Sequence, residues 1–476
     1  NTGLFINNEF VTGAHTIDTI NPSTGKLITS VQAAETEQVN AAVDAAEKAF
    51  YGGWKQSNPR ERSRLMHKLT DLIERDAEDM AQLEALDNGK PFGFSYAVEI
   101  PLVLSQLRYF AGFCDKLHGK VIETEGKLSY TVHEPIGVCA GIIPWNVGAL
   151  MLAWKVAPAI CCGNTIIVKT SELTPLSALK IAALVKEAGF PPGVINIITG
   201  YGPTAGDALS RHMKISKIAF TGSLPTGRAI MKAAAETNLK KVTLELGGKS
   251  PNIIFDDVED LDKAVWYSLN GIFAIGGQIC FGGSRLYIQE GIYDAFLEKF
   301  KAMAAARKVG DPFNDREAEQ GPQVSETQLK RVLSYIESGK AEGATVYHGG
   351  VRKGDTGYFI EPTIFTDVKP DMRIMKEEIF GPVVAITKFK DEKDVIAQAN
   401  DTTYGLAAGV FTSSIKRAIT VSNALEAGTV WVNCYMQVDS NSPFGGYKQS
   451  GLGRESGEYV LQDYTQVKAI KINIGL

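Results

Sequence analysis

Cysteine is scarce in this sequence, and neither sign of charge dominates it. Six cysteines in 476 residues are too few for a disulfide framework, and their spacing matches no zinc motif. We therefore expect reduced thiols, a cytoplasmic location and no metal site. The net charge of −5 provides no basic field for nucleic acid or an anionic membrane. The six thiols belong to Cys114, Cys139, Cys161, Cys162, Cys280 and Cys434.

Long apolar runs are also absent. The most apolar stretch, residues 149–163, is interrupted by Lys155 and Pro158 and is too short to span a bilayer, so we expect no membrane partner. No charged leader followed by an apolar block opens the chain, although a short targeting segment could have been removed before Asn1. With 44% hydrophobic and 22% charged residues, the composition is that of a globular protein of about two or three domains.

From residue 137 onward, short β-branched segments alternate with helices of about a dozen residues. This alternation predicts an α/β fold with a parallel sheet covered on both faces. Before it, residues 3–30 predict short strands and residues 36–111 predict helices. Ligands of such sheets bind at the carboxyl ends of the strands. The predicted ends carry Asn146, Lys169, Gly200 and Gly222.

Cys280 is a lone thiol among glycines, within the segment 276–285. Glycine on both sides lets backbone and ligand approach closely, and no second cysteine stands nearby to form a redox pair. A thiol in this setting is a candidate nucleophile if a base or a positive field activates it. The alternative is a small buried apolar residue, which describes most free cysteines.

Two segments have features of a dinucleotide site. Gly222 and Gly227 lie between an apolar strand and a helix, and a helix N-terminus suits a pyrophosphate. Lys169 and Glu172 follow a strand, where they suit the hydroxyls of a ribose, and the carboxylate disfavours an added 2′-phosphate. The alternatives are a glycine needed only for the turn and an exposed acid near a helix start. Together the segments favour NAD as the cofactor.

Three further positions suit chemistry on a carbonyl group. Glu245 ends an apolar strand, and a buried carboxylate there would accept a proton near neutral pH. The amide of Asn146 could donate to a developing oxyanion. Glu378 and Phe380 could hold a nicotinamide riboside. The alternatives are a surface glutamate, a turn asparagine and an exposed acid beside a core phenylalanine.

Taken together, seven motifs in the same order resemble the aldehyde dehydrogenase superfamily, and the resemblance covers essentially the whole chain. Glu172 resembles the NAD-preferring, non-acylating branch. The motifs are Pro144-Trp145-Asn146, Lys169-Thr170-Ser171-Glu172, Phe220-Thr221-Gly222-Ser223, Leu244-Glu245-Leu246-Gly247-Gly248-Lys249, Gly277-Gln278-Ile279-Cys280, Glu377-Glu378-Ile379-Phe380-Gly381-Pro382 and Pro443-Phe444-Gly445-Gly446.

The resemblance implies a mechanism for oxidising an aldehyde to its carboxylic acid. The Cys280 thiolate attacks the aldehyde, and the Asn146 amide with the backbone N–H of Cys280 stabilises the oxyanion. Hydride leaves for the nicotinamide of NAD, and Glu245 activates the water that hydrolyses the thioester. The implied catalytic set is Cys280, Glu245, Asn146 and Lys155. The implied cofactor contacts are Ile143, Pro144, Trp145, Lys169, Glu172, Gly202, Phe220, Thr221, Gly222, Ser223, Leu246, Gly247, Glu378 and Phe380.

The resemblance also implies a Rossmann-like cofactor domain, an α/β catalytic domain and a small β hairpin for oligomerisation. We expect residues 1–116 and 136–247 in the NAD-binding domain and 248–450 in the catalytic domain. The bridging segment would comprise 117–135 and 451–476. A homodimer or homotetramer is expected, because an unpaired strand edge seeks a partner.

The sequence departs from the family pattern where substrate would bind. Val147, Ala274 and Val438 stand at positions that are commonly aromatic in the family, whereas Trp154 and Phe444 remain. We therefore expect a wide apolar channel that suits a bulky or branched aldehyde. The expected pocket residues are Val147, Met151, Trp154, Ala274, Ile279, Phe281, Val438 and Phe444.

Two alternatives are a CoA-acylating enzyme of the same family and a non-catalytic structural protein on the same fold. Glu245 argues against the first, because a carboxylate that activates water would compete with CoA. The presence of Cys280, Asn146 and Glu245 argues against the second.

Overall fold

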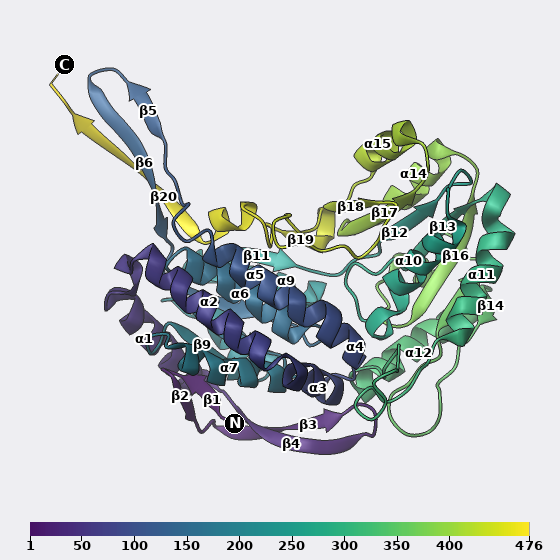
Figure 1. Cartoon of the computed structure of the whole chain (residues 1–476), viewed down its shortest axis with the longest axis horizontal. Coiled ribbons are helices and arrows are strands. Elements are labelled where there is room, and N and C mark those ends of the chain that lie inside the picture. The colour runs from purple at the N-terminus through teal and green to yellow at the C-terminus, as the bar shows by residue number, and fades with distance from the viewer. Residues whose placement is uncertain (476) are drawn as a thin grey trace.

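A mixed eight-stranded sheet forms the core of one half of the molecule in the computed structural model, which describes residues 1–475 (Figure 1). Its five central strands are parallel, and β1 joins β9 antiparallel. In spatial order the strands are β19 (Gly451–Leu452), β11 (Lys241–Glu245), β10 (Lys217–Thr221), β7 (Val138–Ile142), β8 (Thr165–Thr170), β9 (Ile195–Thr199), β1 (Leu4–Ile6) and β2 (Glu9–Val11).

Helices cover both faces of this sheet, because successive side chains of a strand point to opposite sides. Ile166 and Val168 of β8 pack in one core cluster, and Ile167 between them packs in another. The first cluster includes residues of α2 (Pro59–Arg75), α3 (Ala77–Asp87), α5 (Ile100–Ala111), α6 (Gly148–Cys161) and α7 (Leu176–Ala188). The second includes residues of α1 (Thr36–Tyr51), α8 (Asp207–Arg211) and α9 (Leu224–Glu236).

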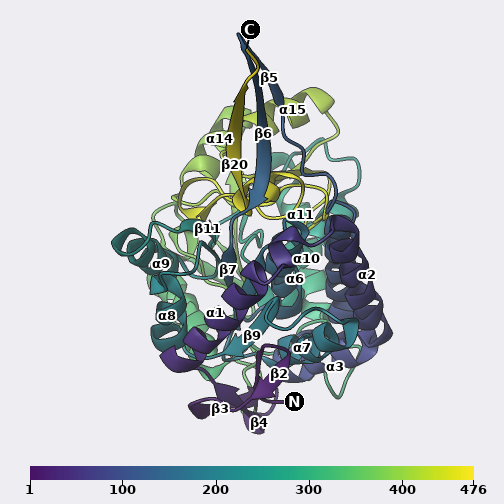
Figure 2. The same ribbon diagram turned by 90° about the vertical axis from the view of Figure 1, so that its left-hand side faces the viewer.

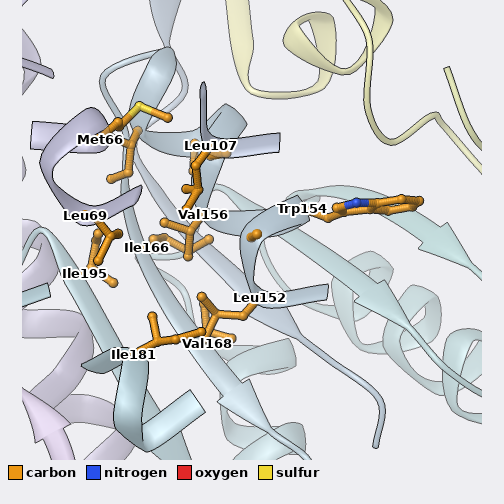
Figure 3. Packing of buried hydrophobic residues seen from close by; sticks show 14 of the residues in the cluster. Met66, Leu69, Leu107, Leu152, Trp154, Val156, Ile166, Val168, Ile181 and Ile195 are labelled. Carbon is orange, nitrogen blue, oxygen red and sulfur yellow. The ribbon is translucent and has the colours of Figure 1, made fainter. Parts of the chain in front are cut away.

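Helix α6 is buried along its whole length, as expected of a helix that is apolar on all sides. Leu152 and Val156 of this helix point among side chains of the sheet and of α7 (Figure 3). Trp154 extends away from them in the same view. Helix α6 therefore contributes side chains to the hydrophobic core and directs the ring of Trp154 away from Leu152 and Val156. Among residues 1–475, no helix has both the length and the apolar character that crossing a bilayer requires.

The other half contains a seven-stranded, mostly parallel sheet (Figure 1). In spatial order its strands are β14 (Thr345–His348), β15 (Thr363–Thr366), β16 (Val383–Phe389), β13 (Arg285–Gln289), β12 (Pro251–Ile254), β17 (Ala407–Phe411) and β18 (Thr429–Val432). The helices of this half are α10 (Leu261–Phe273), α11 (Tyr293–Ala306), α12 (Glu326–Ala341), α13 (Arg373–Lys376), α14 (Glu392–Asn400) and α15 (Ile415–Ala424).

A three-stranded antiparallel sheet projects from the body (Figures 1 and 2). The chain's last strand, β20 (Thr465–Asn473), pairs along its full length with β6 (Lys127–Pro135), and β6 pairs with β5 (Val121–Thr124). The C-terminal strand β20 therefore pairs with the hairpin of β5 and β6, which was predicted to belong to the same bridging segment. A separate hairpin of β3 (His15–Asn21) and β4 (Lys26–Ala33) lies near the N-terminus.

The structure differs from the expected domain boundaries at one place. Residues 451–452 were expected in the bridging segment, but β19 pairs with β11 and forms one edge of the eight-stranded sheet. Leu452 lies opposite Leu244 and Gly451 opposite Glu245, so this short strand covers the end of β11 that carries Glu245. The rest of the domain division remains a prediction.

Candidate active site

A cavity of about 540 Å³ lies between the two halves, and 19 of the predicted site residues line it. They come from the carboxyl ends of strands in the first sheet, from helix α6 and from loops of the second half. These residues are Pro144, Trp145, Asn146, Val147, Met151, Trp154, Thr221, Gly222, Ser223, Glu245, Leu246, Gly247, Ile279, Cys280, Phe281, Glu378, Phe380, Val438 and Phe444.

The loop that carries Cys280 follows α10 and has an unusual backbone. Ile275, Gly276 and Gly277 all have positive φ, and a Cβ on Gly277 would lie 2.0 Å from the carbonyl oxygen of Gly381. The side chain of Gln278 accepts a hydrogen bond from the backbone N–H of Val324 at 2.9 Å. The loop is therefore fixed by its neighbours, which gives Cys280 a defined position at the cavity wall.

Asn146 reaches this loop from the end of β7. Its Nδ2 donates to the carbonyl oxygen of Gln278 at 2.9 Å, two residues before Cys280. A side-chain amide has two N–H donors, so one remains for a ligand. The preceding carbonyl, of Trp145, accepts from Asn88 at 2.6 Å and from Thr174 at 3.0 Å. These bonds hold the loop that bears Asn146 against the Cys280 loop.

Glu245 is buried at the end of β11, and neither carboxyl oxygen has a hydrogen-bond partner among residues 1–475. Burial raises its pKa well above the usual value, and the Glu455 carboxylate raises it further, whereas Lys155 and Arg454 oppose the change. Because a raised pKa makes a carboxylate a stronger base, this side chain suits proton transfer at the cavity wall.

Burial also raises the pKa of the Cys280 thiol. The carboxylates of Glu378 and Glu245 act in the same direction, and the backbone N–H groups of Phe281 and Cys280 oppose them. The thiol and both carboxyl groups are thus close enough for their charges to interact. Without a ligand, protonated Cys280 is favoured, so its ionisation requires a base.

Lys155 is buried beside the cavity and bridges two segments distant in the sequence. Its Nζ donates to Thr221 Oγ1 at 2.9 Å and forms an ion pair with Glu455. Lys155 itself does not line the cavity, although Thr221 does. Sequence reasoning identified Lys155 but missed Glu455, because no local pattern distinguishes this acid from others in the C-terminal segment.

The segment expected to bind phosphate has the predicted form. β10 leads through Gly222 and Ser223 into α9, whose Ser223 N-cap side chain satisfies none of the first N–H groups. A Cβ on Gly222 would lie 2.5 Å from the Phe220 ring, so only glycine fits there. Free N–H groups at the start of this helix, lining the cavity, suit an anionic phosphate.

Glu378 packs closely against the backbone that follows β11. Its Oε1 accepts from the backbone N–H of Gly248 at 3.2 Å, and a Cβ on Gly247 would lie 2.2 Å from Oε2. Burial raises the pKa of Glu378 to about 7. The Phe380 ring stands edge-on to Trp145, with ring centroids 5.1 Å apart. The Glu378 carboxyl group and the rings of Phe380 and Trp145 thus form a part of the cavity wall with one polar group and two apolar rings.

Seven predicted site residues do not line this cavity. Lys169 and Glu172, which were expected to bind a ribose, form an ion pair at 3.6 Å, and Lys169 also donates to the Thr170 carbonyl at 2.9 Å. Ala274 does not line the cavity, whereas its neighbour Ile275 does. The backbone leaves the helical conformation at Ile275, which turns the chain at this point. The full set outside the cavity is Ile143, Lys155, Lys169, Glu172, Gly202, Phe220 and Ala274.

Part of the cavity wall consists of apolar side chains. The rings of Trp154, Phe281 and Phe444 pack edge to face, with centroids 5.4 and 5.6 Å apart. Six apolar residues that line the cavity were not predicted from the sequence, because they lie in helices or loops without a recognisable motif. These six are Phe94, Val98, Leu102, Leu150, Ile275 and Met436. Sequence reasoning also missed the polar lining residues Gln328, Arg331, Tyr335, Glu377 and Tyr404.

Comparisons with known proteins agree with this geometry. A sequence model described as the aldehyde dehydrogenase family matches residues 10–470. The chain is 56% identical to an aldehyde dehydrogenase of Agaricus bisporus over 478 residues, covering 100% of this chain and 95% of that protein. It is 54% identical to the mitochondrial aldehyde dehydrogenase of Homo sapiens, covering 99% of this chain and 92% of that one.

A solved structure is similar over the whole chain. The NAD⁺ complex of an aldehyde dehydrogenase from Bacillus cereus has a TM-score of 0.98 and is 48% identical in sequence. The match covers 100% of this chain and 97% of that one.

Proposed function

Since this chain belongs to the aldehyde dehydrogenase family and is an NAD-dependent enzyme that oxidises aldehydes to acids, we propose that Cys280, Asn146 and Glu245 perform the chemistry. The observation that carries the assignment is the bond from Asn146 to the Gln278 carbonyl, which joins the amide to the loop of Cys280. Glu245, without a partner for either oxygen, lines the same cavity.

Each residue then has a defined task. Cys280 bonds to the aldehyde carbon after Glu245 takes its proton, and the free N–H of Asn146 donates to the oxyanion. NAD, when bound, accepts the hydride. After that transfer Cys280 holds the acyl group as a thioester. Glu245 releases the proton it took from Cys280 to solvent and then takes one from water. The resulting hydroxide attacks the thioester carbon, the C–S bond breaks, and the acid leaves with Cys280 restored as a thiolate. Lys155 and Glu455 hold charge of opposite sign behind Glu245.

The cofactor side of the cavity fits NAD. The uncapped start of α9 suits the pyrophosphate, and the Glu378 carboxyl with the Phe380 ring suits the nicotinamide riboside. Lys169 and Glu172 suit the adenosine ribose, where the carboxylate of Glu172 disfavours a 2′-phosphate. The cavity lining supports the first two contacts, and the ion pair supports the third.

We further propose that the substrate is a bulky apolar aldehyde. The end of the cavity beyond Cys280 is lined by hydrocarbon and aromatic side chains, with valine at 147 and 438. A small aldehyde would leave much of this surface uncovered, and each buried methylene of a larger one contributes about 0.8 kcal/mol. The apolar lining also disfavours a charged substrate.

An aldehyde panel tests this specificity. We expect kcat/KM for a branched or aromatic aldehyde to exceed that for acetaldehyde by about tenfold or more. Val147→Phe should reduce this ratio, because its ring would occupy the space beside Asn146. The matched control is Val351→Phe, where the side chain is 53% exposed and lies outside both the cavity lining and the projecting sheet. A higher kcat/KM for acetaldehyde than for every larger aldehyde would refute the proposal.

We propose that the protein forms a homodimer or homotetramer through the projecting sheet. Both edge strands, β5 and β20, have one side without a partner, and apolar side chains are exposed on them. The most exposed are Val121 at 80% and Val467 at 62%.

Charge on this sheet is expected to dissociate the assembly. The double variant Val467→Asp and Ile472→Asp should lower the mass measured by light scattering after size exclusion, because buried carboxylates oppose association. Tyr51→Asp, at a 68% exposed site outside the sheet, is the matched control. An unchanged mass for the double variant would argue against this interface.

A cytoplasmic location is also proposed. All six cysteines are free thiols, which supports a reducing compartment.

A further inference from the structure

An ammonium group and two carboxylates lie fully buried beside the substrate end of the cavity. Lys90 Nζ lies 2.8 Å from Glu84 Oε2 and 2.5 Å from Glu99 Oε2. The side chains of Lys90 and Glu99 are 0% exposed, and that of Glu84 is 2% exposed. Buried charges are costly, so a cluster of this kind is weak evidence for stability and invites a search for another role.

The cluster is also short of hydrogen-bond partners. Burial raises the pKa of Glu99. The Lys90 ammonium lowers this pKa, and the Glu84 carboxylate raises it. Five buried oxygens in this region lack a partner among residues 1–475, all within residues 84–99. They are Glu84 Oε1, Asp87 Oδ1, Asn88 Oδ1, Ser95 Oγ and Glu99 Oε1.

Glu99 joins two walls of the cavity. It ends a π-helical turn, Ser95–Glu99, and such turns are frequent at functional sites. Its neighbour Val98 lines the cavity. On the other side, α5, which begins directly after Glu99, packs along α6. The backbone N–H of Leu150, in the first turn of α6, also lowers the pKa of Glu99.

The first turn of α6 follows Asn146 directly. No side chain caps this helix at Val147, so a carboxylate beside its N-terminus interacts favourably with its free N–H groups. The same region of the chain holds Asn146 from a second direction, because Asn88 donates to the Trp145 carbonyl at 2.6 Å.

We propose that Glu99, held by Lys90, is a positioning residue that orients Asn146 and the first turn of α6 for the attack on the aldehyde. This inference rests on the proposed function, in which the Asn146 amide stabilises the oxyanion. Glu99 touches neither the substrate nor the cofactor. It acts through the segment 146–151, which carries the oxyanion donor and the substrate contacts Val147, Leu150 and Met151.

Glu99→Gln tests the role, because it keeps the shape of the side chain and removes the charge. We expect a fall of about tenfold in kcat and a rise in the aldehyde KM, since small misplacements of a reacting group have large kinetic effects. The affinity for NAD, measured by fluorescence titration, should remain unchanged. Glu74→Gln is the matched control, because it breaks an exposed ion pair between α2 and Arg108 of α5.

A double-mutant cycle with Asn146→Ala separates positioning from general stability. If Glu99 acts through Asn146, adding Glu99→Gln to Asn146→Ala should lower kcat by less than about twofold. If the two effects multiply, or if Glu99→Gln lowers only Tm, the inference is wrong. If Asn146→Ala alone leaves kcat unchanged, the proposed function fails instead.

Glu99→Asp keeps the inference testable if the glutamine variant does not fold. Aspartate retains the charge but is one methylene shorter, so it cannot reach both Lys90 and the first turn of α6. We expect the same direction of change in kcat and aldehyde KM. Kinetics equal to those of the parent enzyme would overturn the inference.

Discussion

Replacing Cys280 with alanine is expected to lower kcat/KM for aldehyde oxidation by about 10⁴-fold or more, because no other group near the carbonyl can form the covalent adduct. Cys280 is the only cysteine that lines the cavity in the part of the chain that the structure describes. The variant should still bind NAD, because Cys280 belongs to none of the proposed cofactor contacts. Stopped-flow NADH absorbance and a fluorescence titration measure the two properties.

Cys434→Ala is the matched control for this loss. Cys434 is half-buried like Cys280 and lies in the second half of the molecule, but it does not line the cavity. Its replacement should leave kcat/KM within about twofold of the parent value. Comparable losses in the two variants, or substantial activity in Cys280→Ala, would contradict the assignment of the nucleophile.

The parallel sheet could be predicted from the sequence because its strands are buried on both faces. Residues 165–169 and 215–221 are short apolar runs that predict strands, and the observed strands are Thr165–Thr170 and Lys217–Thr221. The strands β14 and β15 were missed. Each has only four residues, and β14 lies at the sheet edge. Strand β19 has only two residues, and its pairing depends on β11, about 200 positions away in the sequence.

Predicting the site succeeded where a residue type and its turn are both distinctive. Cys280, which stands among glycines, and Glu245, which ends a strand, are two such residues. Prediction failed where the cavity wall consists of ordinary apolar residues of distant helices, as at Val98 and Leu102. The contact between Asn146 and the Cys280 loop spans 132 positions in the sequence, so only the folded chain reveals it.

The pH dependence of stability provides an independent test of the environment of Glu245. The pKa of Glu245 is raised above its ordinary value of 4.5, so the folded chain disfavours the ionised form. Its stabilising contribution is complete below pH 4.5 and is lost as pH rises toward the folded pKa. Glu245→Gln cannot ionise, so its Tm should fall less than that of the parent as pH increases. Equal pH profiles of Tm would show that the carboxyl is not disfavoured as an anion.

Glu245→Gln is expected to slow steady-state turnover by about 10² to 10³-fold, because the thioester would lose the base that activates water. Glutamine has nearly the same shape, and neither Glu245 oxygen has a hydrogen-bond partner to lose among residues 1–475, so the fold should be retained. Since Glu245 takes the proton of Cys280 as well as that of water, the pre-steady-state appearance of NADH should also slow. A burst of one equivalent of NADH at the parent rate, with the acyl group detected on Cys280 by mass spectrometry, would show instead that Glu245 serves only the hydrolysis step. Turnover equal to that of the parent enzyme would exclude Glu245 from the chemistry, whereas rescue by added CoA would show that the accumulated species is a thioester.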